Sequence, residues 1–420
     1  MGLAVSVPKV AWQPSETWRV VLPLTGVHLA MFGYDLAHPD RFLNADRAAG
    51  RLQVILGLPA AALKGETLSY IAAHGIPGDW LPQGLIYLLG GQYLLIAFQV
   101  ALALMSVAWV RDIGRHVGLS EPSAAGAALL YGLLPHTLAF PHQLASEALF
   151  VPLVVLAFRA SGLRTGAAIG LATLVRPITM LWPLIHVFAH CERRRYLALA
   201  CAPLLLWMSF VFVASGEFSM GRSGHDLGTN LYWRLQRIGE RLSPAERPRE
   251  RPAGERRASL GDYVAFTMVH PMLTAEFAVR DMAVMGFKSG IERVVLDYLD
   301  LYPDRRAELQ DANGGWRPRV DRGGAAALME LATSQPALVA TAAAGALAFT
   351  LLMLLAVYGA ARWARGADRL ALVAFVVYIF VTVQAVDAAQ SRLRAGAEFA
   401  ICLLAVAGWT ELRRKQRHGR

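Results

Sequence analysis

QGLIYLLGGQYLLIAFQVALALMSVAWV, residues 83–110, contains no charged side chain and is followed directly by Arg111. About 20 apolar residues form a helix that crosses a bilayer with every backbone amide bonded internally, so this stretch predicts a transmembrane helix. The whole chain has a matching composition, because 55% of its 420 residues are hydrophobic, 17% are charged and the mean hydropathy is +0.39. These values exclude an ordinary soluble protein and predict an all-α polytopic membrane protein.

Similar apolar runs recur along the chain. We expect spans at residues 18–37, 83–110, 123–141, 144–160, 196–214, 336–361, 370–388 and 393–411. Basic clusters lie beside them, and all should be cytoplasmic if Lys and Arg set the orientation: Arg111/Arg115, Arg159/Arg164, Arg193 to Arg195, Arg362/Arg365/Arg369 and Arg413 to Arg420. Topology thus explains the excess of 41 Lys and Arg over 31 Asp and Glu, and we expect no nucleic-acid partner.

Residues 164–190 do not fit one crossing, because the basic cluster at 193–195 would then face outward. Arg176 and Pro177 supply a bend, since proline removes a helical amide bond and restricts the residue before it. A charged arginine also indicates surroundings other than lipid. We predict two short helices or a broken hairpin, with Arg176 near the outer break.

With this bend both termini are cytoplasmic, and two long polar connections lie outside the membrane. The chain then divides into an N-terminal transmembrane module at 1–214, a large extracytoplasmic loop at 215–335, and C-terminal helices with a basic tail at 336–420. The first connection, at 38–82, lies within the N-terminal module. We find no internal repeat.

Both connections contain segments with helical spacing of apolar residues. After residue 48 the pattern predicts an amphipathic helix lying along the membrane surface. In the second connection, residues 234–257 are basic and proline-rich and predict a flexible loop, while 263–285 and 291–301 predict helices.

Metal and disulfide patterns are absent from the sequence. Cys191, Cys201 and Cys402 lie in or beside apolar runs at unrelated spacings, so neither a disulfide nor a zinc site is expected. No His-Glu or Cys-Cys metal pattern occurs. We therefore assign no metal ligand, although a divalent metal held by carboxylates alone stays open.

Two aspartates of the first connection, Asp40 and Asp46, are candidate general bases at the level of the lipid headgroups. Each also has an ordinary explanation. Asp40 would pair with Arg41, and Asp46 would lie in a first helical turn, with Asn44 as N-cap, where a carboxylate complements the helix dipole. Spacing alone favours the ordinary explanation for both.

Several short motifs occur in order along the chain: LPQGLIY at 81–87, Gln99, SEALF at 146–150, GLATLVRP at 170–177 and SRLRAGAE at 391–398. In this order and at these positions the chain resembles the GT-C superfamily of polyprenyl-phosphate-sugar glycosyltransferases. The branch it resembles most is that of the aminoarabinose transferases and protein O-mannosyltransferases. The resemblance covers about half of the chain and implies a GT-C-like transmembrane helix bundle.

In that family an aspartate of the first outer loop is the catalytic base. The resemblance assigns this role to Asp46, with Asp40 in reserve, although the chain has Ala45-Asp46 where the family often shows an acidic pair or Gly-Asp. Arg392 and Arg394 lie at the expected outer start of the last span, where guanidinium groups would hold the donor phosphate. The alternative is that both arginines only extend to the membrane interface.

Charged residues inside apolar runs are candidates on physical grounds alone. Arg176 is costly there without a partner, and Glu147 at the outer start of the fourth span is the partner we expect. The pair would contact substrate or would be an ion pair that only fixes two helices. His142 and Gln143, just before Glu147, are further candidate sugar or phosphate contacts, or ordinary solvated side chains.

The resemblance implies an inverting glycosyltransferase that moves a sugar from a polyprenyl-phosphate donor to a lipid, glycan or protein acceptor. We expect it in the inner (plasma) membrane of a bacterium, in contact with membrane lipids and with its active site outside the cytoplasm. One alternative is an O-antigen or exopolysaccharide polymerase or ligase, which would not need the first-loop aspartate. Another is a lipid or solute transporter, against which the missing repeat and the long second connection argue.

Overall fold

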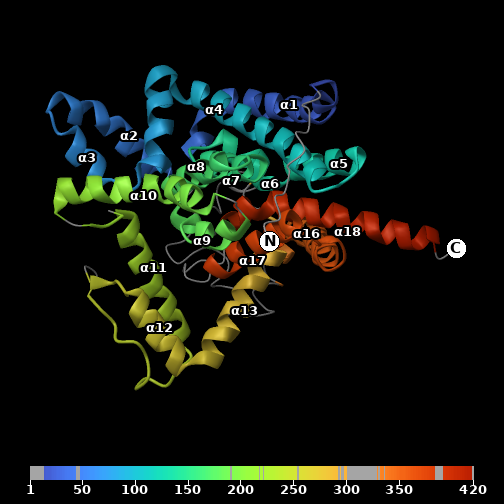
Figure 1. Cartoon of the computed structure of the whole chain (residues 1–420). Helices are drawn as coiled ribbons and strands as arrows, with labels where there is room; N and C mark the ends of the chain where they lie inside the picture. The colour runs from blue at the N-terminus through green and yellow to red at the C-terminus, as the bar shows by residue number, and fades with distance from the viewer. Residues whose placement is uncertain are drawn as a thin grey trace.

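The computed structural model describes residues 14–43, 48–189, 192–216, 218–220, 222–252, 255–291, 294, 298–299, 329, 332–334, 336–383 and 391–418. All regular secondary structure in these residues is helical. The α-helices are α1 (Pro14–Ala37), α2 (Ala48–Leu63), α3 (Thr67–Ala73), α4 (Pro77–His116), α5 (Glu121–Gly132), α6 (Pro135–Ala139), α7 (Glu147–Arg159), α8 (Leu163–Val175), α9 (Trp182–His186), α10 (Arg193–Ser215), α11 (Arg222–Gly239), α12 (Leu260–Val269), α13 (Pro271–Phe287), α16 (Pro336–Trp363), α17 (Ala367–Thr382) and α18 (Glu398–His418). Most form one bundle, from which α2 with α3 and α11 with α12 project (Figure 1).

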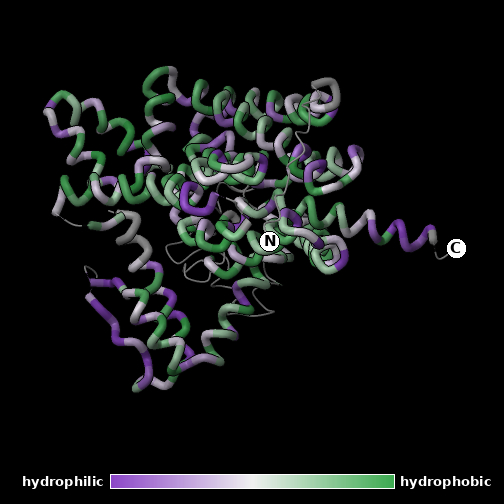
Figure 2. Tube along the Cα trace, in the orientation of Figure 1, coloured by the Kyte–Doolittle hydropathy of each residue, from purple (hydrophilic) through white to green (hydrophobic). Residues whose placement is uncertain are grey.

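Five helical segments in the described part of the chain are long and apolar enough to cross a membrane. They are Thr17–Ala37, Trp80–His116, Arg193–Ser215, Val339–Trp363 and Leu393–Arg417, and they coincide with five of the predicted spans. Hydrophobic positions dominate the bundle, while hydrophilic positions concentrate at the end of α18 and in the projection that holds α12 (Figure 2). The chain is thus consistent with a multi-pass membrane protein.

The span predicted at 123–141 is not one straight helix. Helix α5 ends at Gly132, and the chain bends by 62° before the helical segment that begins at Pro135. Pro135 has no amide hydrogen, and it disfavours the helical conformation at Leu134, so it favours a break at this point. This region is a bent pair of short helices.

Two other predicted spans form shorter helices. The span predicted at 144–160 forms α7, whose 13 residues extend about 20 Å at 1.5 Å per residue. This is less than the thickness of a bilayer core, and α7 is buried along most of its length, so its apolar character reflects protein packing. The span predicted at 370–388 contains α17, of 16 residues, and its last residues, 384–388, lie outside the described part.

The predicted break near Arg176 is confirmed. Helix α8 ends at Val175, Arg176 has an extended backbone, and a short 3₁₀ helix, η3 (Pro177–Thr179), leads towards α9. The chain then turns back, because His186 and Gly166, on either side of the break, both lie beside Tyr196. The segment is therefore a broken hairpin, and the cluster at 193–195 returns to the end of the bundle where α8 began.

The basic clusters gather at this same end of the bundle. Arg159 donates to Asp112 at 2.9 Å, and Arg115 lies 3.0 Å from Glu121. The next cluster joins them, since Arg369 donates to the carbonyl oxygen of Val117 at 2.7 Å. If Lys and Arg set the orientation, all the basic clusters must lie on the same face of the membrane. Their common position at one end of the bundle meets this condition.

The tightest packing of spans lies between α16 and α18. Gly359 of α16 faces the backbone of Leu404 and Gly408, and Gly408 of α18 faces the backbone of Leu355. A Cβ atom at either glycine would collide with a carbonyl oxygen of the other helix. Small residues allow such close approach of transmembrane helices, so these glycines bring α18 against the bundle.

The two long connections are largely helical where they are described. The amphipathic helix predicted after residue 48 is α2, which buries Ala48 and Ile55. The loop predicted at 234–257 begins later than expected, at residue 240, because α11 continues to Gly239. The reason is packing, since Leu235 and Ile238 on its last two turns are buried.

Candidate functional site

A non-helical segment between α6 and α7 lies in the interior of the bundle. It contains the 3₁₀ helix η2 (Phe140–His142) and residues 143–146, all of them buried. Irregular backbone at membrane depth is tolerated only where other protein groups satisfy it. Gln83 donates to the Ala145 carbonyl oxygen at 2.8 Å, and the Leu144 amide donates to the Phe42 carbonyl oxygen at 2.9 Å.

Gln99 supports the same segment. With its amide turned to donate, its nitrogen lies 2.8 Å from the carbonyl oxygen of Pro141 and 3.2 Å from that of Gln143. This accounts physically for a polar residue in the middle of an apolar span. Gln143, a predicted substrate contact, is 1% exposed, and its predicted role stays untested.

Glu147 and Arg176 form the ion pair expected from the sequence. Arg176 donates to the Glu147 carboxylate, whose side chain is 3% exposed, while that of Arg176 is 19% exposed. The pair exists because α7 begins at Glu147 and α8 ends before Arg176, so two helix termini meet. Ser146 donates to the second oxygen of Glu147 at 3.2 Å, and Phe150 lies beneath the guanidinium of Arg176 at 5.8 Å.

A second buried ion pair lies at the start of α18. Nη2 and Nε of Arg394 lie 3.1 and 3.2 Å from Oε1 of Glu398, and His136 Nδ1 lies 2.8 Å from the same oxygen. Arg394 also donates to the carbonyl oxygen of Met285 in α13, and its guanidinium stacks over Phe349 at 3.7 Å. Arg394 is 0% exposed, so it joins α18, α13 and α16 and does not extend to the membrane interface.

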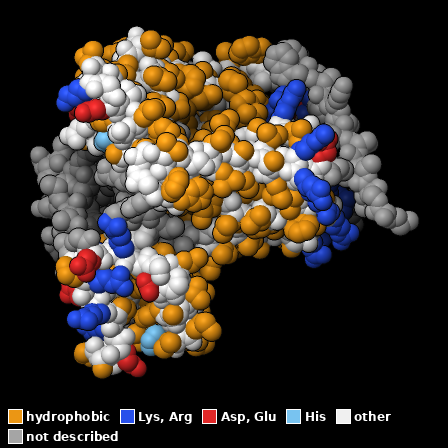
Figure 3. Space-filling view, turned by 60° about the vertical axis from the view of Figure 1, so that its left-hand side comes forward, with side chains coloured by type: hydrophobic (Ala, Val, Ile, Leu, Met, Phe, Trp, Pro, Cys, Tyr) orange, Lys and Arg blue, Asp and Glu red, His pale blue; other side chains and the backbone are white. Residues whose placement is uncertain are grey.

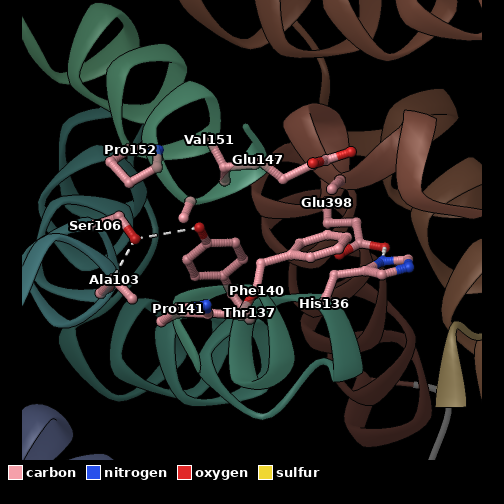
Figure 4. Close-up of a pocket in the computed structure, with 13 residues that line it drawn as sticks. Ala103, Ser106, His136, Thr137, Phe140, Pro141, Glu147, Val151, Pro152 and Glu398 are labelled. Carbon is pink, nitrogen blue, oxygen red and sulfur yellow. Dashed lines mark hydrogen bonds and ion pairs between the residues drawn. The ribbon is translucent and has the colours of Figure 1, made fainter. Parts of the chain in front are cut away.

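The two ion pairs share one cavity, because Glu147 and Glu398 both line it. His136 and Glu398 lie on one side and Ser106 on the other (Figure 4). The cavity measures about 20 Å³, which holds about one water molecule and excludes a sugar. Among the described residues Oε2 of Glu398 has no hydrogen-bond partner, so this cavity contains an acceptor that is ready for a donor.

His142 belongs to a different buried network. Its Nδ1 lies 2.5 Å from Oδ2 of Asp35, and its Nε2 lies 2.9 Å from Nδ1 of His28. Tyr298, from the second connection, donates to Oδ1 of Asp35 at 2.9 Å. Burial and the neighbouring Asp35 carboxylate raise the pKa of Tyr298, which keeps its hydroxyl a donor. His142 is 0% exposed, and its predicted role as a substrate contact stays untested.

The predicted catalytic aspartates are not part of either network as far as they are described. Asp40 lies in η1 (Pro39–Leu43), is 67% exposed, and sits 3.3 Å from Arg41, as its ordinary explanation predicts. Asp46 and the side chain of Arg392 lie outside the described residues. Their catalytic and phosphate-binding roles stay predictions.

Five polar residues of these networks were not singled out from the sequence. His28 and Asp35 lie in the first apolar run, where an ionisable side chain is itself a sign of function or buried pairing. Glu398 ends the SRLRAGAE motif but was given no role. Nothing in the local sequence indicates that His136 or Tyr298 would complete these networks, because their partners lie 262 and 263 residues away.

No group of three or more His, Cys, Asp or Glu side chains within the described ranges is arranged to hold a metal ion. Comparison of the chain with protein-family models, with characterised proteins and with solved structures gave no match.

Proposed function

We propose that the chain is an integral membrane glycosyltransferase that moves a sugar from a polyprenyl-phosphate donor to an acceptor hydroxyl outside the cytoplasm. The observation that carries the proposal is that two arginines inside an apolar bundle, Arg176 and Arg394, each pair with a glutamate. The two glutamates, Glu147 and Glu398, line one small cavity. Guanidinium groups are suited to a lipid-linked phosphate, because their planar fork pairs with two oxygens and stays charged.

The two arginines would serve different tasks. Arg176 is the more exposed of the two, at 19% against 0%, and lies at a helix break, so it is the one we assign to the donor phosphate. A phosphate would replace the Glu147 carboxylate as its partner, exchanging one charge-assisted bond for another. Arg394 would be a positioning residue, since its guanidinium is occupied by Glu398 and Met285.

The reaction we propose is a single displacement. Asp46, with Asp40 in reserve, takes the proton of the acceptor hydroxyl, and the acceptor oxygen bonds to the anomeric carbon. The bond from that carbon to the phosphate oxygen breaks, polyprenyl phosphate leaves, and the configuration inverts. Arg176 would stabilise the charge that develops on the departing phosphate.

The experiment compares transfer of labelled sugar from polyprenyl-phosphate donors by the purified wild-type protein and by Arg176→Lys and Arg176→Gln. Lysine keeps the charge but loses the fork, so it should retain donor binding better than glutamine. Equal transfer by all three proteins would remove Arg176 from the site.

A lipid or solute transporter is the second candidate, because charged residues inside a transmembrane bundle also line transport pathways. The pairs Glu147–Arg176 and Glu398–Arg394 are the observation that favours a transporter. The donor assay separates the two, since a transporter would move its cargo without releasing free polyprenyl phosphate.

A further inference from the structure

Helices α11, α12 and α13, with the residues that connect them, form a separate lobe, which we call the α11–α13 lobe. Its core contains Leu231, Tyr232 and Ala258, against which Tyr263 and Phe266 pack. Two ion pairs close it: Arg234 with Asp281, both buried, and Arg241 with Glu276 on the surface. The lobe is therefore a folded unit with a fixed surface.

One side of this lobe exposes large apolar side chains. Leu260, Val264 and Met268 follow one another at four-residue intervals along α12 and are 66%, 48% and 78% exposed. Val269 and Met272 continue the row at the turn into α13, at 71% and 83%. A row of this kind is unusual on a surface that faces water and marks a site of contact with protein or membrane.

The lobe also carries exposed charged side chains. Residues 241–252 carry exposed arginines and glutamates, among them Arg247, Arg249 and Glu250. In Figure 3 the hydrophobic side chains of the projecting lobe gather along the side turned towards the apolar body of the protein, and the charged ones along the side turned away. This segregation is that of an amphipathic element at a bilayer surface.

The position of the lobe relative to the spans places it at membrane level. Span α10 ends at Ser215, at the end opposite its basic start, and the chain continues within a few residues into α11. At the other end of the lobe α13 packs on span α16 and exposes Val279 and Phe287, at 62% and 52%. The apolar surface of the lobe thus continues into that of the spans.

We propose that the α11–α13 lobe lies on the lipid bilayer, with the apolar row of α12 and Met272 inserted between headgroups and acyl chains. The leaflet is the one opposite the basic clusters. Trp233 and Arg256, stacked at 5.3 Å, are of the types that settle at headgroup level. The proposal goes beyond the glycosyltransferase activity and does not depend on it.

Insertion of the lobe would also connect the bilayer to the buried ion pair of Arg394 and Glu398 through α13. Helix α13 starts at the inserted turn and ends at Phe287, and the carbonyl oxygen of Met285 in its last turn accepts from Arg394. The bilayer therefore holds one end of a helix whose other end contacts the buried cluster.

The test is spin labelling of the full chain in nanodiscs of phosphatidylethanolamine and phosphatidylglycerol. Cys191, Cys201 and Cys402 are replaced by alanine, and a single cysteine is introduced as Met268→Cys or, as the matched exposed control, Glu250→Cys. Collision rates with oxygen, which partitions into lipid, and with a water-soluble nickel complex are then compared.

Because an inserted apolar face lies about 5–10 Å below the headgroup boundary, we expect an oxygen-to-nickel ratio about fivefold higher at 268 than at 250. Equal ratios would place the lobe in water and overturn the proposal. A label at 268 shielded from both reagents would do the same, since protein would then cover the row. Should Met268→Cys fail to fold, Val264→Cys replaces it with the same expectation.

Discussion

Nδ1 of His142 lies 2.5 Å from Oδ2 of Asp35, and this contact joins the first span to the irregular segment that precedes α7. The same aspartate accepts from Tyr298, so three distant parts of the chain meet at one carboxylate. A buried network of this kind stabilises the fold only while all its members are satisfied. It also positions the segment that leads directly into Glu147.

Loss of this carboxylate should destabilise the protein. Asp35→Asn leaves His142 without an anionic partner, and we expect a decrease of about 3–5 kcal/mol in the free energy of unfolding. Thermal unfolding of the purified protein in detergent measures it. Asp40→Asn is the matched control, because Asp40 is 67% exposed and surface changes usually stay within about 0.5 kcal/mol. Equal midpoints for the two variants would show that the network has no structural role.

The pair of Glu147 and Arg176 should behave as one unit. Glu147→Gln removes the ion-pair partner of Arg176, which is 19% exposed, and Arg176→Gln removes that of Glu147, which is 3% exposed. We expect the double variant to lose less stability than the sum of the two, with a coupling of about 0.5–3 kcal/mol. The free energy of unfolding is measured for the wild type, the two single variants and the double variant, which completes a double-mutant cycle. Strict additivity would mean that the pair is not formed.

The contact of α16 with α18 should not tolerate a side chain. Gly359→Leu would drive a side chain into the backbone of Leu404, so we expect little folded protein in size-exclusion chromatography. Gly126→Leu in α5 is the control, because no atom lies within 4 Å of a Cβ placed there. Normal elution of the Gly359 variant would contradict the packing.

The orientation of the chain in the membrane follows from the basic clusters, which lie at one end of the bundle. In intact cells whose outer barrier is permeabilised, a cysteine at Glu250→Cys should react with a membrane-impermeant maleimide, while one at Arg414→Cys should react only after lysis. Both variants are made in the protein whose three native cysteines are replaced by alanine. The reverse pattern would put the α11–α13 lobe in the cytoplasm and rule out the proposed site of transfer.

Much of the fold can be predicted from hydrophobic runs and charge bias. The broken hairpin at Arg176 was predictable because the clusters on either side of it fix where the chain must return. The region 123–141 is a bent pair of helices, and 144–160 holds a helix of 13 residues. The second difference arises because a buried helix such as α7 and a lipid-facing helix are equally apolar in sequence. Pro135 was the sequence signal against a straight helix at 123–141.

The candidate site was predictable only where two charges lay in apolar runs. Glu147 and Arg176 could be paired from their positions at neighbouring helix ends. The network of Asp35, His142 and Tyr298 could not, because it depends on tertiary contacts across more than a hundred residues. Arg394 forms a buried pair with Glu398, and its predicted contact with phosphate stays a prediction.

The most direct test of the central claim measures polyprenyl phosphate released from labelled polyprenyl-phosphate-sugar donors by the purified protein, with membrane extract supplying the acceptor. We predict release by the wild type, and a loss of about 10²–10⁴-fold in Asp46→Asn with donor binding retained, because only the base is removed. Full release by both Asp46→Asn and Asp40→Asn would contradict the account, as would a wild-type protein that binds these donors but never cleaves them.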